Sequence, residues 1–183
     1  MSCANELTSL AASCAATKKK GGVKKKVWAA PFGAVTFTYD VDGNIDTVTI
    51  ATTSPATVLT TYEGRRLKNN GAYTGEVGEN ANTISQALNL VLYAKEQNER
   101  DAINALFQSD ELIVFIETES GDIEAWGVDT GLLPSALTGG TGTALNDSTG
   151  ITVTLTGSQD GIATKCKFGA TLADDIAYLD ALT

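Results

Sequence analysis

The sequence predicts a mainly β fold of the α+β class, an antiparallel β-sandwich or split barrel with one flanking helix and short terminal helices. Two observations support this prediction. Apolar and polar residues alternate in several segments that follow Trp28, which is the pattern of half-buried strands. Turn-forming Gly, Asn and Asp residues separate these segments. A chain of 183 residues that is 43% hydrophobic can bury one sizeable core, so we expect a single β-rich domain over residues 27–183.

Residues 1–26 are predicted to form a basic N-terminal arm. Leu7, Leu10, Ala11 and Cys14 recur at helical spacing, which favours a short amphipathic helix over residues 4–16. Such a helix is too short to be stable without a partner surface. The arm contains six lysines and a single acid, a net charge of +5, whereas the rest of the chain has a net charge of −14. The pair at 21–22, within the lysines, is Gly-Gly and predicts a hinge between the arm and the rest of the chain.

A first hairpin is predicted from segments 35–39 and 45–50, which flank Asp42-Gly43. Asp-Gly is a strong hairpin signal because a type I′ turn needs positive φ at both central residues. The acids of this loop also resemble part of a calcium-binding loop. However, Gly43 stands at the fourth position instead of the sixth, and Ala51 replaces the Glu expected at the twelfth. The hairpin is therefore the favoured interpretation.

A second hairpin is predicted from segments 57–67 and 72–77, joined by the turn Asn69-Asn70-Gly71. Its tip would carry three cations, Arg65, Arg66 and Lys68. The apolar residues of the next segment, 83–93, fit either a helix or one face of a strand.

Later elements are predicted from clearer patterns. Ile103 and Leu106 belong to an apolar stripe that predicts a helix over 95–108. Segments 112–118 and 123–128 predict another hairpin, and Ile151 begins an alternating strand over 151–156. Thr171 followed by Asp174 resembles a capping box that begins a short last helix.

The composition argues against an enzyme and against a metal or cofactor site. The chain has no histidine, which excludes the common Ser–His and Cys–His pairs of nucleophilic catalysis. Cys3, Cys14 and Cys166 are an odd number without CxxC spacing, so neither a disulfide framework nor a zinc site is indicated. No apolar run approaches membrane-spanning length. We therefore predict a protein that is not an enzyme, that needs no cofactor and that has no membrane partner.

From residue 83 onward the order of predicted elements resembles that of the tail tube proteins of bacteriophages and related contractile injection machines. The matching elements are the strand 87–93, the helix 95–108, the hairpin 112–128 and the strand 151–157. The resemblance covers about 75 residues and implies a β-sandwich or split barrel that assembles into hexameric rings. Stacked rings would form a channel through which DNA passes without specific binding.

The resemblance therefore implies a virion structural protein that assembles in the cytoplasm of a bacterial host, with copies of itself and other virion proteins as partners. An acidic channel wall would repel the DNA backbone, because affinity for phosphate comes mainly from Lys and Arg. A head–tail connector and a capsid-decoration protein are alternatives from the same class. A β-sandwich module that binds a glycan or protein ligand is the alternative from another class, and it would need an exposed aromatic patch.

Contacts between subunits are predicted at the cations of the arm and of the second hairpin. Such residues could dock on acidic faces of neighbouring rings, or they could be solvated or ordered against an acidic neighbour. Exposed ion pairs contribute only about 0–1 kcal/mol each, so repetition around a ring would have to supply the strength. The candidate contact residues are Lys18, Lys19, Lys20, Lys24, Lys25, Lys26, Arg65, Arg66 and Lys68.

Overall fold

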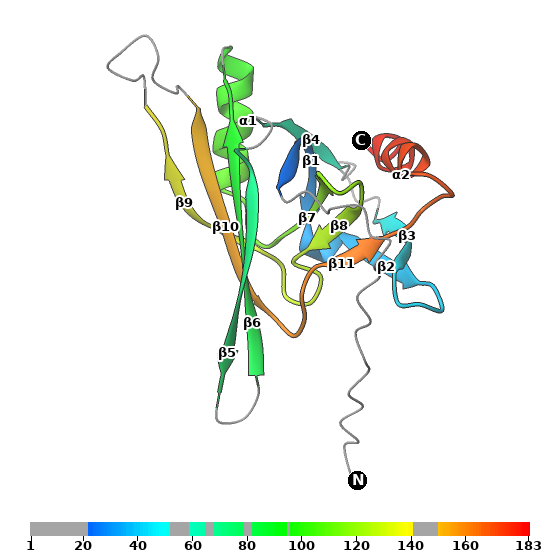
Figure 1. The fold of residues 1–183 in the computed structure, drawn as a ribbon. Coiled ribbons are helices and arrows are strands. Elements are labelled where there is room, and N and C mark those ends of the chain that lie inside the picture. Colours follow the sequence, from blue (N-terminus) through cyan, green and yellow to red (C-terminus); the bar gives the residue numbers. More distant parts are fainter. Residues whose placement is uncertain (1–21, 52–58, 65–67, 79–81, 95, 141–149) are drawn as a thin grey trace.

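The computed structural model describes residues 22–51, 59–64, 68–78, 82–94, 96–140 and 150–183. These residues form two β-sheets and two α-helices, with one short 3-10 helix at Phe32–Ala34 (Figure 1). The larger sheet is central, with the smaller sheet on one side and a helix on the other. The predicted mainly β, α+β fold is confirmed.

The larger sheet has seven strands. In spatial order they are β2 (Val35–Tyr39), β3 (Ile45–Ile50), β11 (Thr164–Cys166), β8 (Ile123–Trp126), β7 (Leu112–Thr118), β1 (Val23–Pro31) and β4 (Thr60–Glu63). All neighbours are antiparallel except β3 and β11, which are parallel. The predicted hairpins at 35–50 and 112–128 are the β2–β3 and β7–β8 pairs of this sheet.

The smaller sheet has four antiparallel strands. They are β5 (Asn70–Val77), β6 (Asn82–Leu92), β10 (Ile151–Gln159) and β9 (Leu133–Thr138), in that spatial order. Bridges Gly64–Leu92 and Leu112–Leu132 join the two sheets at two corners. The two sheets therefore form a sandwich-like arrangement that is joined at these corners, and the ambiguous segment 83–93 forms most of the strand β6.

The apolar core lies on both faces of the seven-stranded sheet. One cluster fills the space between the two sheets and includes Leu88, Leu155 and two residues of α1 (Gln97–Phe107), Ile103 and Leu106. The second cluster lies on the opposite face, where α2 (Leu172–Asp180) covers residues that include Phe115. Because both faces are covered, six consecutive residues of β7 are buried, as is typical of strands enclosed on both sides.

Both predicted helices of the β-rich domain are confirmed, with slightly different ends. α1 begins after Glu96, which forms a capping box with Glu99. α2 begins after Thr171, whose hydroxyl accepts a hydrogen bond from the Asp174 amide at 3.3 Å. The Asp174 carboxylate accepts one in return from the Thr171 amide at 3.0 Å, so the capping box read from the sequence is present.

The second predicted hairpin is wrong. β4 pairs with β1 in the large sheet, whereas β5 pairs with β6 in the small sheet. The reason is Asn69, which was expected in a turn but is buried between the sheets. Its side-chain amide donates to the Lys24 carbonyl at 3.1 Å and its side-chain oxygen accepts from the Val91 amide at 2.8 Å. One side chain thus joins a strand of each sheet where the chain crosses between them.

The predicted boundary after residue 26 also differs from the structure. β1 begins at Val23, so Lys24, Lys25 and Lys26 belong to a strand of the β-rich domain. The predicted helix over 4–16 lies outside the described residues.

The turn of the first hairpin is longer than a two-residue type I′ turn. Tyr39 pairs with Ile45, so the loop spans residues 40–44. The Asp40 carboxylate accepts hydrogen bonds from the amides of Asp42 and Asn44 at 2.9 and 2.8 Å. These bonds within the loop hold the pKa of Asp40 below its usual range, with the side-chain bond from Asn44 as the largest cause.

Candidate assembly surfaces and an interior cleft

The predicted contact residues separate into two groups. Lys18, Lys19, Lys20, Arg65 and Arg66 lie outside the described residues. The other four are described. Lys68 is exposed beside the crossing between the sheets, and Lys24, Lys25 and Lys26 lie on β1.

The three lysines of β1 pair with acids of their own chain. Lys24 forms an ion pair with Glu117 of β7, which is mostly buried. Lys25 pairs with Glu63 of β4 at 3.3 Å, where both side chains are largely exposed. Such a pair adds little stability because water screens it. The sequence left two interpretations of these lysines, a solvated arm or a segment ordered by acidic neighbours. The three ion pairs agree with the second interpretation.

Lys26 takes part in a compact cluster that ties α2 to the sheet. Its ammonium pairs with the carboxylate of Asp180 at the end of α2 and lies 5.2 Å from the ring centre of Trp28. The same carboxylate accepts a hydrogen bond from the Trp28 indole Nε1 at 2.8 Å. The bond from Lys26 is the largest cause that lowers the pKa of Asp180, and the Trp28 bond adds to it.

The Asp180 cluster predicts acid sensitivity. Because the folded-state pKa of Asp180 is lowered, its stabilising effect is present above the unfolded carboxyl pKa of about 3.9 and is lost as pH falls through the folded value. Asp180→Asn keeps an acceptor for Trp28 but removes the charge. We expect its urea midpoint to lie below that of the wild type at neutral pH, with the difference shrinking below about pH 4. Asp46→Asn, at an exposed position of β3, is the control. A difference that persists unchanged into acid would contradict this role.

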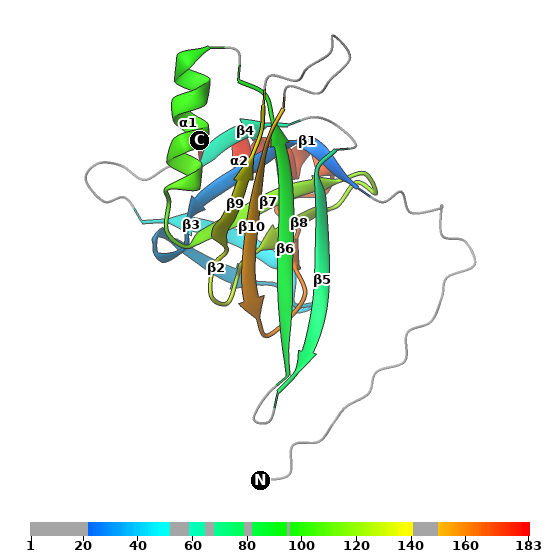
Figure 2. The same ribbon diagram turned by 90° about the vertical axis from the view of Figure 1, so that its left-hand side faces the viewer.

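The four-stranded sheet differs sharply from the rest of the molecule in charge. Its four strands contain one charged side chain, Glu76. Leu88 and Leu155 point into the core, so the alternate residues of the strands face away from it. That outward face, which is turned to the viewer in Figure 2, is built of Asn70, Ala72, Thr74, Glu76, Thr83, Ser85, Ala87, Asn89, Val91, Thr152, Thr154, Thr156 and Ser158. Thr154 donates to Asn89 across it at 2.8 Å.

The two outer strands of this sheet also carry exposed apolar side chains. β5 and β9 each pair with only one neighbour among the described strands. Tyr73 and Val77 of β5 are 42% and 89% exposed, and Leu133 and Leu137 of β9 are 51% and 37% exposed. This sheet was not predicted from the sequence as a candidate surface. The uncharged runs 70–75, 82–92 and 151–159 were the available signal.

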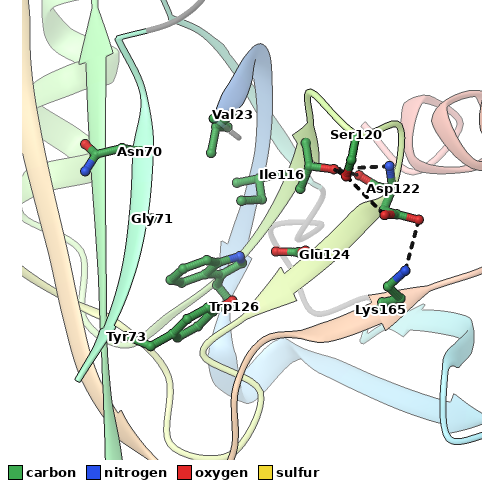
Figure 3. Close-up of a pocket in the computed structure, with 12 residues that line it drawn as sticks. Val23, Asn70, Gly71, Tyr73, Ile116, Ser120, Asp122, Glu124, Trp126 and Lys165 are labelled. Atoms are coloured by element: carbon green, nitrogen blue, oxygen red, sulfur yellow. Dashed lines mark hydrogen bonds and ion pairs between the residues drawn. The ribbon is translucent and has the colours of Figure 1, made fainter. Parts of the chain in front are cut away.

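A cleft of about 380 Å³ opens between the two sheets next to the start of β1 (Figure 3). Its floor is the aromatic pair Tyr73 and Trp126, whose rings stack with centres 4.7 Å apart. Gly71 lies so close to the Trp126 ring that a Cβ atom at position 71 would collide with the ring. Trp126 is 2% exposed, and its Nε1 donor has no hydrogen-bond acceptor among the described residues. Such a buried donor is costly to leave unpaired.

The wall of the cleft is mainly acidic. Asp122 and Glu124 line it together with Lys165, which pairs with Asp122 at 3.1 Å. Glu124 stands directly opposite Lys165 in the β8–β11 register. Burial raises the pKa of Tyr73 to about 12, and the charge of Glu124 adds to this effect, while a hydrogen bond with the Ala163 backbone opposes it.

Tyr73 therefore predicts a loss of stability in strong base. Its folded-state pKa of about 12 exceeds the model-peptide value of 10.0. The contribution is complete below pH 10 and is lost as pH rises through 12. Tyr73→Phe keeps the stack on Trp126 and removes the phenol. We expect the urea midpoint of the wild type to fall more steeply than that of the variant above about pH 10. Parallel curves over that range would contradict the prediction.

Other chemistry is sparse among the described residues. They contain no group of three His, Cys, Asp or Glu side chains placed to hold a metal ion. Neither described helix has the length and apolar character needed to cross a membrane. Burial, with smaller effects of Asp175 and Glu124, raises the pKa of the Cys166 thiol well above its usual range.

Comparison of the chain with protein-family models, curated proteins and solved structures found no match.

Proposed function

We propose that this protein is a bacteriophage virion structural protein, a tail-tube-like subunit that forms stacked hexameric rings around a DNA channel. The observation that carries the proposal is the four-stranded sheet, which combines an almost uncharged outer face with two edges that each have a single described partner. The virion location, the ring and the hexameric symmetry come from the resemblance in the order of elements.

The outer face of the sheet suits a channel wall for DNA. Cations supply most of the affinity of proteins for phosphate, and the four strands contain no Lys or Arg. Its hydroxyl and amide groups keep the face wettable. The expected acidic wall is replaced by a neutral one in this proposal, because Glu76 is the only acid on these strands. DNA would pass over such a wall without binding tightly.

The edges of the sheet suit the formation of a ring. An unpaired edge strand is a template for pairing with another chain, and β5 of one copy can add to β9 of the next. This contact joins two different surfaces, so it closes into a ring when the rotation between copies is correct. Leu137 would then meet Tyr73 or Val77 of the neighbour on the core-side face of the joined sheet, and Leu133 would pack against the outward face of the neighbouring β5. Both contacts would bury apolar area that is exposed in the single chain.

The cations remain candidates for contacts between subunits or rings. Lys68 is exposed and available for such a role. Lys24 and Lys26 already have partners within their chain, so an intersubunit role for them would require shared or exchanged ion pairs. The alternative of a ligand-binding module needs an exposed aromatic patch; both tryptophans are buried, whereas Tyr39 and Tyr73 are exposed.

Negative-stain electron microscopy of the purified protein over a concentration series tests the proposal. We expect rings or tubes of uniform diameter, and stacking into tubes would separate a tail tube from a single-ring connector. Light scattering on the same samples gives the mass of the assembly. Monomers at every protein and salt concentration would contradict a self-assembling ring and would favour capsid decoration or ligand binding.

A further inference from the structure

The space between the two sheets is closed by α1 along one side. β4 is the last strand of the large sheet and β9 the last strand of the small sheet on this side. α1 contacts β9, and it shares a pocket of about 220 Å³ with Tyr62 and Glu63 of β4. Its buried residues Ile103 and Leu106 belong to the core between the sheets. Figure 2 shows α1 beside the β9 edge, with β5 at the opposite edge.

The opposite side of this space, next to β5, is not covered by either described helix. The cleft of about 380 Å³ opens there, and its lining includes Val23 and Ile116 of the core between the sheets. Tyr73 of β5 forms part of the floor and is 42% exposed. The same core is therefore closed by a helix at the β9 edge and bordered by an open cleft at the β5 edge.

α1 keeps one large aromatic side chain partly outside its own core. Phe107, the last residue of α1, is 37% exposed. It follows Ala102 by five positions, which places the two side chains about 140° apart around the helix axis. Ala102 lines the pocket beside β4, and the buried residues Ile103 and Leu106 lie between these two directions. Phe107 is therefore on the flank of α1 that is turned to β9.

The cleft and Phe107 lie on the same side of the four-stranded sheet. Tyr73 stands opposite the buried Gln86 in the β5–β6 register, so its side chain is on the core side, where α1 also packs. In the proposed ring, β5 of one copy adds to β9 of the next at the usual strand spacing of about 4.8 Å. This pairing brings α1 of the next copy beside the cleft and turns Phe107 towards Tyr73.

We infer that α1 of one copy closes the interior cleft of the next copy, with the Phe107 ring packed against Tyr73. The occupant is a second copy of this chain, and the inference rests on the proposed ring. Each of the two rings is partly exposed in the single chain, and aromatic pairs prefer ring centres about 4.5–7 Å apart. The contact also fixes the register. Polar, nearly uncharged edge strands can slip along one another, whereas an aromatic ring held in a cleft permits one alignment of β5 with β9.

Thiol cross-linking of the assembled full-length protein tests this contact. The three native cysteines are first replaced by alanine, and Tyr73→Cys/Phe107→Cys is then introduced. A short bismaleimide should join position 107 of one copy to position 73 of the next, so a denaturing gel should show a ladder of linked chains up to the full ring. Thr74→Cys/Phe107→Cys is the matched control. Thr74 faces the outer side of the sheet, so this variant should give no ladder.

Phe107→Ala measures how much the contact contributes to assembly. Truncating an aromatic anchor of an interface should raise the protein concentration at half assembly about tenfold, as measured by light scattering. Tyr39→Ala, which removes a partly exposed ring from β2, should leave that concentration unchanged. Rings without a ladder in the Tyr73→Cys/Phe107→Cys variant, or an unchanged concentration in Phe107→Ala, would overturn the inference and leave the ring in place. A wild type that stays monomeric at every concentration would overturn both.

Discussion

Replacing both Leu133 and Leu137 of β9 by lysine should abolish ring formation. In the proposed ring these side chains are buried against β5 of the neighbouring copy, and four of the exposed large apolar residues lie on these two edge strands. Lysine on an edge strand is a common natural device against pairing between sheets. Burying an unpaired ammonium there would cost several kcal/mol, repeated at every interface. Electron microscopy and light scattering should show monomers at concentrations at which the wild type forms rings.

The matched control is Val41→Lys. Val41 is fully exposed in the loop after β2, away from both edges, so this variant should assemble as the wild type does. Circular dichroism should show that the Leu133→Lys/Leu137→Lys variant stays folded. Rings from the folded double variant would remove β9 from the interface and would contradict the proposed pairing of β5 with β9.

Phe115→Ala and Ile116→Ala should each destabilise the protein strongly. The two residues are neighbours on β7 and point to opposite faces of the large sheet, Phe115 towards α2 and Ile116 towards the small sheet. Both are fully buried. Removing a buried Phe side chain costs about 3–5 kcal/mol and a buried Ile about 2–5 kcal/mol. Either loss is a large fraction of a typical total stability of about 5–15 kcal/mol.

Urea unfolding measures both effects, with Thr36→Ala on β2 as an exposed control that should stay within about 0.5 kcal/mol of the wild type. A sheet with one solvated face would tolerate one of the two β7 substitutions. A small effect of either substitution would therefore show that the face of the large sheet to which that residue points is not covered in solution. It would contradict the arrangement in which the small sheet covers one face and α2 the other.

Local signals in the sequence predicted the elements that depend on near neighbours. The hairpins at 35–50 and 112–128 are closed by short loops, and α2 begins at a capping box of two residues, Thr171 and Asp174. In each case the interactions that define the element lie within a few residues of one another. Patterns of turn residues and of alternation are sufficient there.

The errors fall where residues distant in sequence decide the structure. Asn is a common residue type in turns, but Asn69 is buried and forms hydrogen bonds with Lys24 and Val91, which link the two sheets. Lys24 and Lys26 belong to a run of cations, for which the sequence left a solvated arm and a segment ordered against an acidic neighbour both open. The structure places them on β1, beside Glu117 and Asp180 from far along the chain.

The candidate surfaces divide in the same way. The sequence contains the uncharged strands, the acidic excess and the lysine run, so the separation of charge along the chain was readable from it. The pairing of β5 with β6 and of β10 with β9 decides which uncharged strands form one sheet. It also decides that the cleft opens beside Gly22, at the start of β1. Strand pairing depends on the summed burial of many distant side chains, so it is settled only when the whole core packs.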